Sequence, residues 1–324
     1  MTVIKGVCEG CYDLFHFGHM NGIRQAAEKC DNLTVAIHST ETIRNEKTEP
    51  VMSNEERYSM VKACRWVDDL WLDIPYIYSL KDLEEKGITK VFHGNDPVFG
   101  ENGVDVYLHL KERNYFENFE RTKFVSTTNL IGKMLYRRKY ENYTEKTENF
   151  CAKKKKYLFD LLKKFEIPKK EKKGRIVYVD GTFDLFHAGN ASFLENARLQ
   201  GDYLIVGIHS SKDSHKEKGV IPIQSLIERQ ITVSGIKYVD EIIPNSPFYI
   251  NEEFIKSNKI DVIVYGKCFK YYENVKNIVE IKKIVSDFPY LSSQSIISRI
   301  IDNYDKYYER NIKRGHNIDD SLFL

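Results

Sequence analysis

The chain has 324 residues, of which 42% are hydrophobic and 30% are charged, and its formal net charge is +2 at pH 7. This length suits two domains of ordinary size, and the nearly balanced charge gives no general attraction to nucleic acid or to anionic membranes. The apolar runs are too short for a signal peptide or a membrane-spanning helix, so we expect a cytoplasmic protein without stable membrane insertion.

Predicted strands and helices alternate along both halves of the chain. In the first half, KGVCEG and NLTVAIHS have the composition of buried strands, and NGIRQAAEKC and NEERYSMVKACRWV have helical apolar spacing. In the second half, RIVYVDG and YLIVGIHS again predict strands. Such alternation predicts parallel sheets with right-handed crossovers, whose ligands bind beyond the carboxyl ends of the strands where the strand order reverses.

The second half repeats the first at a nearly constant offset of 171 or 172 positions. GCYDLFHFGHMNGIRQA at 10–26 recurs as GTFDLFHAGNASFLENA at 181–197, and Glu56-Arg57 recurs as Glu228-Arg229. This regularity predicts one α/β domain used twice. We expect a first domain at 1–140, a basic linker at 141–174 and a second domain at 175–324.

The linker contains YLFDLLKKF, whose apolar spacing predicts a short helix between lysine-rich segments. A weak site for anionic membrane surfaces is the alternative interpretation. The six cysteines are scattered, apart from the C-x-x-C formed by Cys8 and Cys11. Because a zinc site would need a second pair of ligands, we expect reduced thiols.

Each repeated cassette follows a predicted strand and opens a predicted helix, which suits a phosphate group. Gly10 permits a tight turn, and Gly18 allows the backbone to approach a ligand closely. The helix that begins near His19 offers N–H groups and a positive dipole end to an anion. His16 and His19 can both donate to one phosphate, whereas two core histidines would not be expected to bracket a glycine at this turn.

The H-x-G-H of the first cassette resembles the signature of the cytidylyltransferases, in the wider nucleotidylyltransferase superfamily. ERTKFVSTTNLIGKM at 120–134 is similar to their R-T-x-x-[IV]-S-T-[TS] signature. The resemblance implies two Rossmann-like doubly wound domains, transfer of CMP from CTP, and Mg²⁺ that accompanies CTP. The tandem layout, CEGCYD and HGND are similar to the members that use phosphoethanolamine, which implies CDP-ethanolamine as the product.

The resemblance also implies roles for residues of the first domain, where catalysis rests on positioning and on neutralising phosphate charge. The implied catalytic residues are His16, His19, Lys47 and Arg121. The implied CTP-binding residues are these four together with Cys11, Tyr12, Ser126, Thr127 and Thr128. The implied acceptor-binding residues are Glu9, Tyr76 and Asp96.

Several of these residues also have a plainer interpretation. On composition alone Lys47 is a solvated lysine, the Ser-Thr-Thr triplet is a helix cap, and Tyr76 and Asp96 are a core tyrosine and a turn aspartate. Arg57 either reaches a phosphate or lies on a helix surface. Lys133 stands where family members often carry arginine, and its role is left open.

The second domain departs from the pattern. Asn190 replaces the second histidine and cannot carry positive charge, and Ser292-Ser293-Gln294 replaces the Ser-Thr-Thr triplet. Five residues before this triplet stands Asp287, in the place of Arg121, and an acid there repels a triphosphate. Although His187 is kept, we expect this domain to be catalytically inactive or weak, with a structural or regulatory role.

The sequence has three rival interpretations. Phosphocholine is the alternative acceptor, because RIIDNYDKYYERNIKRGHN is similar to the segment that follows the catalytic domain in choline-phosphate members. The long amphipathic membrane helix expected after that segment is missing, which favours phosphoethanolamine. A non-catalytic nucleotide sensor or scaffold is the second rival, and a class I aminoacyl-tRNA synthetase is disfavoured because its lysine-rich loop is missing. No nucleic-acid partner is expected, and the oligomeric state is left open.

Overall fold

The computed structural model describes residues 3–99, 103–139 and 152–316. The chain divides into two compact units, Met1–Ser126 and Thr127–Leu324. Within the described residues, each unit contains one five-stranded sheet.

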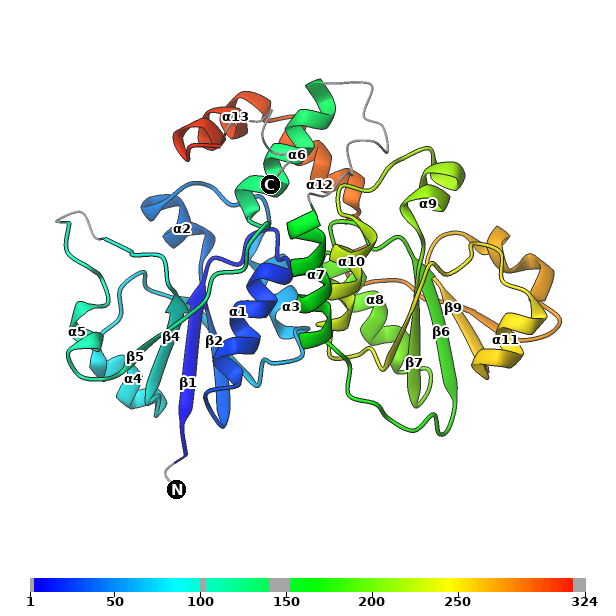
Figure 1. Ribbon diagram of the computed structural model, residues 1–324, viewed down its shortest axis with the longest axis horizontal. Helices are drawn as coiled ribbons and strands as arrows, with labels where there is room; N and C mark the ends of the chain where they lie inside the picture. The colour runs from blue at the N-terminus through cyan, green and yellow to red at the C-terminus, as the bar shows by residue number, and fades with distance from the viewer. Residues whose placement is uncertain (1–2, 100–102, 140–151, 317–324) are drawn as a thin grey trace. The chain divides into compact units, whose positions relative to one another are not determined.

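The first unit is built around a parallel sheet. Its elements are β1 (Lys5–Gly10), α1 (Phe17–Ala27), β2 (Asn32–His38), α2 (Thr40–Glu46), α3 (Asn54–Lys62), β3 (Asp69–Ile74), α4 (Leu80–Lys86), β4 (Lys90–Gly94), α5 (Leu108–Lys111) and β5 (Phe116–Phe119). The strand order is β3-β2-β1-β4-β5, so the order reverses at the central strand β1. Helices α1 and α3 cover one face of the sheet, and α4 and α5 cover the other (Figure 1).

The core of the first unit explains why its strands are rich in apolar residues. Val7, Ala36 and Val91 come from the neighbouring strands β1, β2 and β4, and they pack in one cluster with Leu83 of α4. Strands covered on both faces are buried along their length, unlike the half-exposed strands of an open antiparallel sheet. This packing fixes the carboxyl ends of β1, β2 and β4 side by side, where the candidate site lies.

The second unit begins with two helices and then repeats the sheet. Its elements are α6 (Thr127–Lys139), α7 (Ala152–Lys164), β6 (Ile176–Gly181), α8 (Ala188–Arg198), β7 (Tyr203–Ile208), α9 (Ser211–Lys218), α10 (Leu226–Ser234), β8 (Glu241–Pro244), α11 (Glu252–Asn258), β9 (Val262–Tyr265), the 3₁₀ helix η2 (Phe269–Val275), β10 (Glu280–Lys283), α12 (Ser293–Ile301) and α13 (Tyr304–Lys313). The order β10-β9-β6-β7-β8 is the same topology with β6 at the centre. Helices α8 and α10 cover one face and α11 the other (Figure 1). The predicted pair of doubly wound parallel sheets is confirmed.

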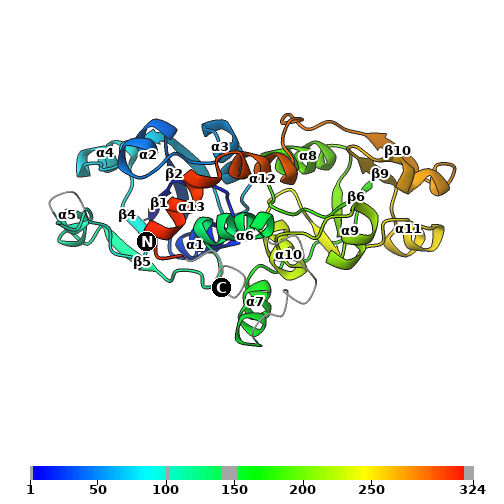
Figure 2. The same cartoon turned by 90° about the horizontal axis from the view of Figure 1, so that it is seen from above.

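Helices α6 and α7 pack against other helices of the second unit. Helix α6 contacts α12 and α13, and α7 contacts α10; Figure 2 shows α6 beside α12 and α13. Helix α7 includes the predicted segment YLFDLLKKF, and its Leu158 and Leu161 are buried. The apolar side of this helix is therefore covered by protein. The part of the predicted linker at 141–151 lies outside the described residues.

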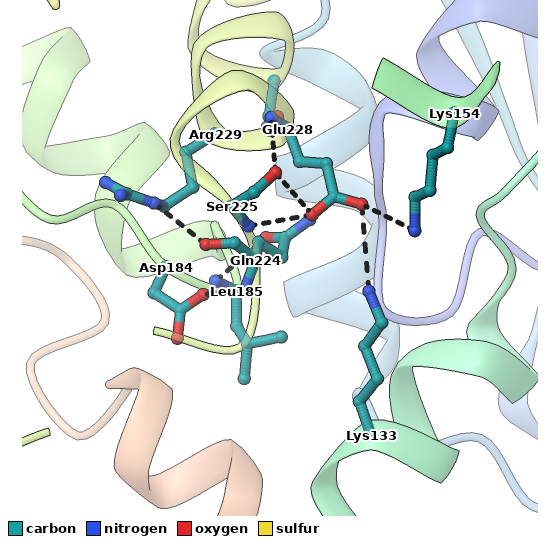
Figure 3. Close-up of polar contacts among 9 residues, drawn as sticks. Lys133, Lys154, Asp184, Leu185, Gln224, Ser225, Glu228 and Arg229 are labelled. Carbon is teal, nitrogen blue, oxygen red and sulfur yellow. Dashed lines mark hydrogen bonds and ion pairs between the residues drawn. The ribbon is translucent and has the colours of Figure 1, made fainter. Parts of the chain in front are cut away.

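Glu228 joins three of these helices through buried charges (Figure 3). Its Oε2 accepts from the Ser225 N–H at 2.8 Å and the Ser225 hydroxyl at 2.9 Å, which closes a capping box on α10. Its Oε1 lies 3.8 Å from Lys133 Nζ on α6 and 3.7 Å from Lys154 Nζ on α7. Burial acts to raise the pKa of Glu228, but the two lysines and Ser225 outweigh it and hold that pKa below its usual value. Lys133 therefore connects α6 to α10.

Two further expectations can be compared with the described residues. Cys8, Cys11, Cys30, Cys64 and Cys268 form no disulfides, and Cys151 lies outside the described residues. Among the helices in the described part of the chain, none is long and apolar enough to cross a membrane.

Candidate nucleotide and acceptor site

The cassette that follows β1 is held in place by Arg57, which is buried on α3. Its Nη1 donates to the carbonyl oxygen of Cys11 at 2.7 Å and to that of His38 at 2.8 Å. Arg57 is 1% exposed, so it neither lies on the helix surface nor points to solvent where a phosphate would arrive. Both predictions for Arg57 were wrong, because its guanidinium satisfies carbonyl groups at the ends of β1 and β2. Arg229 makes the same pair of contacts in the second unit.

Asp13 is a second structural residue of the cassette, and sequence reasoning did not single it out. Its buried carboxylate accepts from the N–H groups of Val51 and Met52 at 2.9–3.0 Å. Asp184 accepts from two consecutive N–H groups in the same way. The signal was present in the D-L-F-H shared by the two cassettes, because an acid retained in the copy that lacks the second histidine indicates a role in folding.

His16 and His19 cap helix α1 reciprocally. The His16 Nδ1 accepts from the Gly18 N–H at 3.1 Å and from the His19 N–H at 3.4 Å, while the His19 Nδ1 accepts from the His16 N–H at 3.3 Å. The two rings are stacked with their centroids 3.9 Å apart. Because backbone donors occupy both Nδ1 atoms, each neutral ring carries its proton on Nε2. The cap leaves one Nε2–H donor on each of the two stacked rings at the N-terminus of α1, where the helix dipole favours an anion.

Burial keeps both imidazoles uncharged in the absence of substrate. Desolvation, with a smaller contribution from Arg121, lowers the pKa of His19 to about 3. Desolvation also lowers the pKa of His16 well below its usual value, and His19 and Arg121 act in the same direction. What this pair presents to an arriving phosphate is therefore two oriented N–H donors rather than a fixed positive charge.

The second signature packs directly against the start of α1. A Cβ atom on Gly18 would lie only 2.7 Å from Val125 Cγ1, so the approach of the two segments requires glycine. The Thr122 hydroxyl donates to the Gly18 carbonyl at 3.3 Å and accepts from Asn21 Nδ2 at 2.9 Å. The fold thus brings the two signatures, about 105 residues apart in sequence, to one place within the first unit.

The predicted cations lie around the same junction. Arg121 Nη1 donates to Asp96 Oδ2 at 2.5 Å, and both side chains are more than half exposed. Lys47 Nζ lies 3.9 Å from Cys11 Sγ and 5.3 Å from the centroid of the Tyr76 ring. The structure therefore groups Lys47 with Cys11 and Tyr76, and it pairs Arg121 with Asp96, a residue predicted for the other substrate.

Glu9 lies at the carboxyl end of β1 and is 7% exposed. The Tyr107 hydroxyl donates to its Oε1, whereas its Oε2 is buried without a hydrogen-bond partner in the described part of the chain. Burial raises the pKa of Glu9 to about 7, against the opposing effects of Tyr107, Tyr78 and Lys47. An unsatisfied carboxylate oxygen beside aromatic rings suits an ammonium group. No motif marked Tyr107, which approaches Glu9 only through the fold.

The remaining predicted residues have contacts of their own. Tyr12 is buried, its hydroxyl donates to the Cys8 carbonyl at 3.3 Å, and its φ of 52° forms part of the cassette turn. Ser126 ends the first unit, and Thr127 begins α6 in the second. In the second unit, the Thr128 carbonyl accepts from Asn311 Nδ2 at 3.0 Å and its hydroxyl accepts from Arg314 Nη1 at 3.3 Å.

In the second cassette, Asn190 keeps the helix cap. The His187 N–H donates to Asn190 Oδ1 at 3.3 Å, as the His16 N–H donates to His19 Nδ1. The amide oxygen replaces the ring acceptor, and the amide NH₂ remains as a donor. Because His19 is itself neutral, the loss of charge at Asn190 is a smaller difference than the sequence argument supposed.

Asp287 was assigned to the wrong position. The Ser192 hydroxyl donates to Asp287 Oδ2 at 2.7 Å, and the Asp287 N–H donates to Ser192 Oγ at 2.9 Å. Ser192 is the counterpart of Asn21, whose partner is Thr122, so Asp287 takes the place of Thr122. It is absent from the lining of the cavity beside the second cassette, and the predicted repulsion of a triphosphate by Asp287 does not hold. The residue before it is a serine, so the positive charge of Arg121 still has no counterpart.

Comparison with known proteins agrees with this duplicated geometry. The model of the cytidylyltransferase-like family matches residues 7–133 and 178–307, one segment in each half of the chain. The chain belongs to the cytidylyltransferase-like family. The predicted resemblance is therefore confirmed for both domains.

Relatives within the family differ in how much of the chain they match. A probable ethanolamine-phosphate cytidylyltransferase of Encephalitozoon cuniculi is 38% identical over 94% of this chain and 96% of its own length. The ethanolamine-phosphate cytidylyltransferase of Dictyostelium discoideum is 35% identical over 96% of this chain and 94% of its own length. The choline-phosphate cytidylyltransferase 2 of Arabidopsis thaliana is 34% identical over 43% of this chain and 49% of its own length. The choline-phosphate match thus covers less than half of the chain.

Proposed function

We propose that the first domain transfers CMP from CTP to phosphoethanolamine, giving CDP-ethanolamine and pyrophosphate, a step in phosphatidylethanolamine synthesis. The observation that carries this proposal is similarity through both domains to proteins named ethanolamine-phosphate cytidylyltransferase. Similarity to choline-phosphate cytidylyltransferases supports the same reaction type but covers only part of the chain.

In this reaction an oxygen of the acceptor phosphate attacks the α-phosphorus of CTP, and pyrophosphate leaves. The Nε2–H groups of His16 and His19 donate to phosphate oxygens as negative charge develops in the transition state. Lys47 and Arg121 neutralise the triphosphate, and Arg121 exchanges its contact with Asp96 for a phosphate oxygen. Mg²⁺ that accompanies CTP would supply further charge neutralisation. Within the described residues no group of three or more His, Cys, Asp or Glu side chains could hold a metal ion, so the phosphates of CTP would provide the main ligands of the ion.

Glu9 supports phosphoethanolamine over phosphocholine as the acceptor. The unsatisfied Glu9 Oε2 needs a hydrogen-bond donor, and a primary ammonium group has three N–H donors. The quaternary ammonium of phosphocholine has none, so it would leave this buried oxygen unsatisfied at a cost of about 1–3 kcal/mol. Tyr107, bonded to the other oxygen, holds the carboxylate in place.

The test measures conversion of labelled CTP to a CDP-alcohol with each acceptor alone. We expect a larger kcat/KM for phosphoethanolamine than for phosphocholine, and a ratio below one would overturn the acceptor. Glu9→Gln should lower that ratio, whereas the exposed Glu41→Gln of α2 should leave it unchanged. Binding of CTP without turnover of either acceptor would instead favour the sensor or scaffold.

A further inference from the structure

The second domain keeps the acidic and aromatic contacts that surround Glu9 in the first. Asp180 lies at the position of Glu9, at the carboxyl end of the central strand β6. The Tyr272 hydroxyl donates to Asp180 Oδ1 at 2.7 Å, as the Tyr107 hydroxyl donates to Glu9. His209 Nε2 lies 3.4 Å from the same Oδ1 atom.

The lysine beside this acid is also kept. Lys218 Nζ lies 5.4 Å from the centroid of the Phe248 ring, as Lys47 Nζ lies 5.3 Å from that of Tyr76. His209 stacks on Phe248 with ring centroids 3.7 Å apart, and the corresponding histidine of the first domain packs against Tyr76. The second domain has therefore retained the acid, the aromatic contacts and the lysine of this part of the site together.

These side chains line a cavity of about 390 Å³ at the carboxyl ends of the second sheet. Asp180, Lys218, Phe248, Tyr271 and Tyr272 all contribute to its wall. The Asp180 side chain is 4% exposed, and its Oδ2 has no hydrogen-bond partner within the described residues. A buried carboxylate oxygen without a donor is costly, and Asp180 is one of the residues that line the cavity.

Part of the set predicted to hold a triphosphate is changed in the second domain, although His187 and Lys218 keep the positions of His16 and Lys47. The place of Arg121 is taken by a serine, and Asp287 is turned toward Ser192. Asn190 keeps the helix cap and an amide donor but replaces the imidazole of His19. The buried acid and its aromatic contacts have thus been kept, whereas the arginine and the second histidine of the phosphate-binding set have not.

We propose that the second domain binds a small phosphorylated primary amine without transferring a nucleotide to it. The ammonium group donates to Asp180 Oδ2 between the aromatic walls, and the phosphate binds Lys218 at the cavity mouth. Lys218 is exposed and already donates to the Thr182 hydroxyl at 2.9 Å. Opposite charges at the base and the mouth match a zwitterion with one charge at each end. The choice of phosphoethanolamine as this ligand rests on the proposed function.

Equilibrium dialysis of labelled phosphoethanolamine against the full chain, without CTP, tests the proposal. We expect two molecules bound per chain, one in Asp180→Asn, one in Glu9→Gln and none in the double variant. Two molecules bound by Asp180→Asn, or a single molecule abolished by Glu9→Gln alone, would overturn it. Turnover by the unmodified chain is measured separately. Turnover with a single binding site rejects only the inference, whereas two sites without turnover reject only the proposed function.

A second pair of variants keeps the test valid if Asp180→Asn weakens the fold through Tyr272. Lys218→Met changes an exposed side chain and should weaken binding at the second site about tenfold or more, as for loss of a charge-assisted contact. Lys216→Met, an exposed lysine of the same helix α9 outside the cavity wall, should bind two molecules with unchanged affinity. Equal affinities for the unmodified chain and Lys218→Met would contradict the assigned phosphate contact.

Discussion

Replacing Glu228 by glutamine should strongly destabilise the second unit, because Glu228 compensates two buried lysines. Glutamine can keep the capping box with Ser225, since either residue type serves there. The change therefore removes the negative charge while leaving the shape of the side chain and the cap in place. Lys133 and Lys154 then remain as positive charges with side chains only 10% and 4% exposed.

The magnitude follows from this burial. Removing one partner of a buried ion pair costs about 3–5 kcal/mol, and the partial exposure of Lys133 places the expected loss near the lower end, at about 3 kcal/mol. In a unit of this size, 1 kcal/mol shifts the melting temperature by about 2–4 °C. Calorimetry should therefore show the transition of the second unit lowered by about 6–12 °C.

The pH dependence of the stability difference between the unmodified chain and Glu228→Gln provides an independent check. The folded-state pKa of Glu228 lies below its usual value, so its contribution is fully present above the unfolded-state pKa of about 4.3 and is lost as the pH falls through the folded-state pKa. The unmodified chain should thus be more stable than Glu228→Gln at pH 7, and the gap should narrow below about pH 4.

Matched variants show which result would refute this reasoning. Glu253→Gln removes an exposed first-turn glutamate of α11, and it should shift the transition by no more than about 2 °C. In a chain that already carries Lys133→Met and Lys154→Met, Glu228→Gln should lower the free energy of unfolding much less than it does in the unmodified chain. A shift for Glu228→Gln as small as that of the control, or full additivity with the lysine changes, would show that the lysines are not compensated by Glu228.

Three further predictions concern the proposed reaction. His16→Ala or His19→Ala should lower kcat by about 10²–10³, as for loss of one preorganised donor, and His19→Asn, which keeps an acceptor for the helix cap, separates this loss from loss of the cap; near-normal turnover in any of these variants that folds would reject the site. Because the pKa of Glu9 is about 7 and the ammonium needs the ionised carboxylate, kcat/KM for phosphoethanolamine should fall as the pH drops below about 7, and this part of the fall should be absent from Glu9→Gln. Calorimetry should count one CTP per chain, since the second domain lacks the positive charge of Arg121, and a count of two would show that its nucleotide site still works.

The fold could be predicted from the sequence because each pattern of strand, cassette and helix occurs twice. The cassette, the strand that precedes it and the helix that follows it occur in both halves, so one assignment supported the other. The constant offset also marks residues with a structural role. Glu56-Arg57 and Glu228-Arg229 recur as pairs, and a pair retained in the copy that lacks the second histidine indicates the structural role that Arg57 has.

The errors arose where the outcome depends on three-dimensional contacts. Asp287 was counted back from the Ser-Ser-Gln triplet, but the spacing of this loop differs between the copies, and only its bonds to Ser192 reveal its true counterpart. Tyr107, at the start of α5, and Tyr272, in η2, reach their carboxylates from positions distant in sequence without a shared motif. Lys133 faces a residue 95 positions later, and no local pattern specifies such a partner.

The reciprocal cap at the start of α1 restricts which substitutions such a site can accept during evolution. In both cassettes the residue at the third helical position must offer an acceptor to the N–H of the capping histidine, or the helix loses its start. Asparagine meets that requirement with its amide oxygen, so the exchange of histidine for asparagine alters the chemistry while leaving the helix nucleated. A histidine at this position can therefore be exchanged for asparagine in one substitution without loss of the helix cap. Aliphatic residues at the same position would have removed catalysis and the cap together.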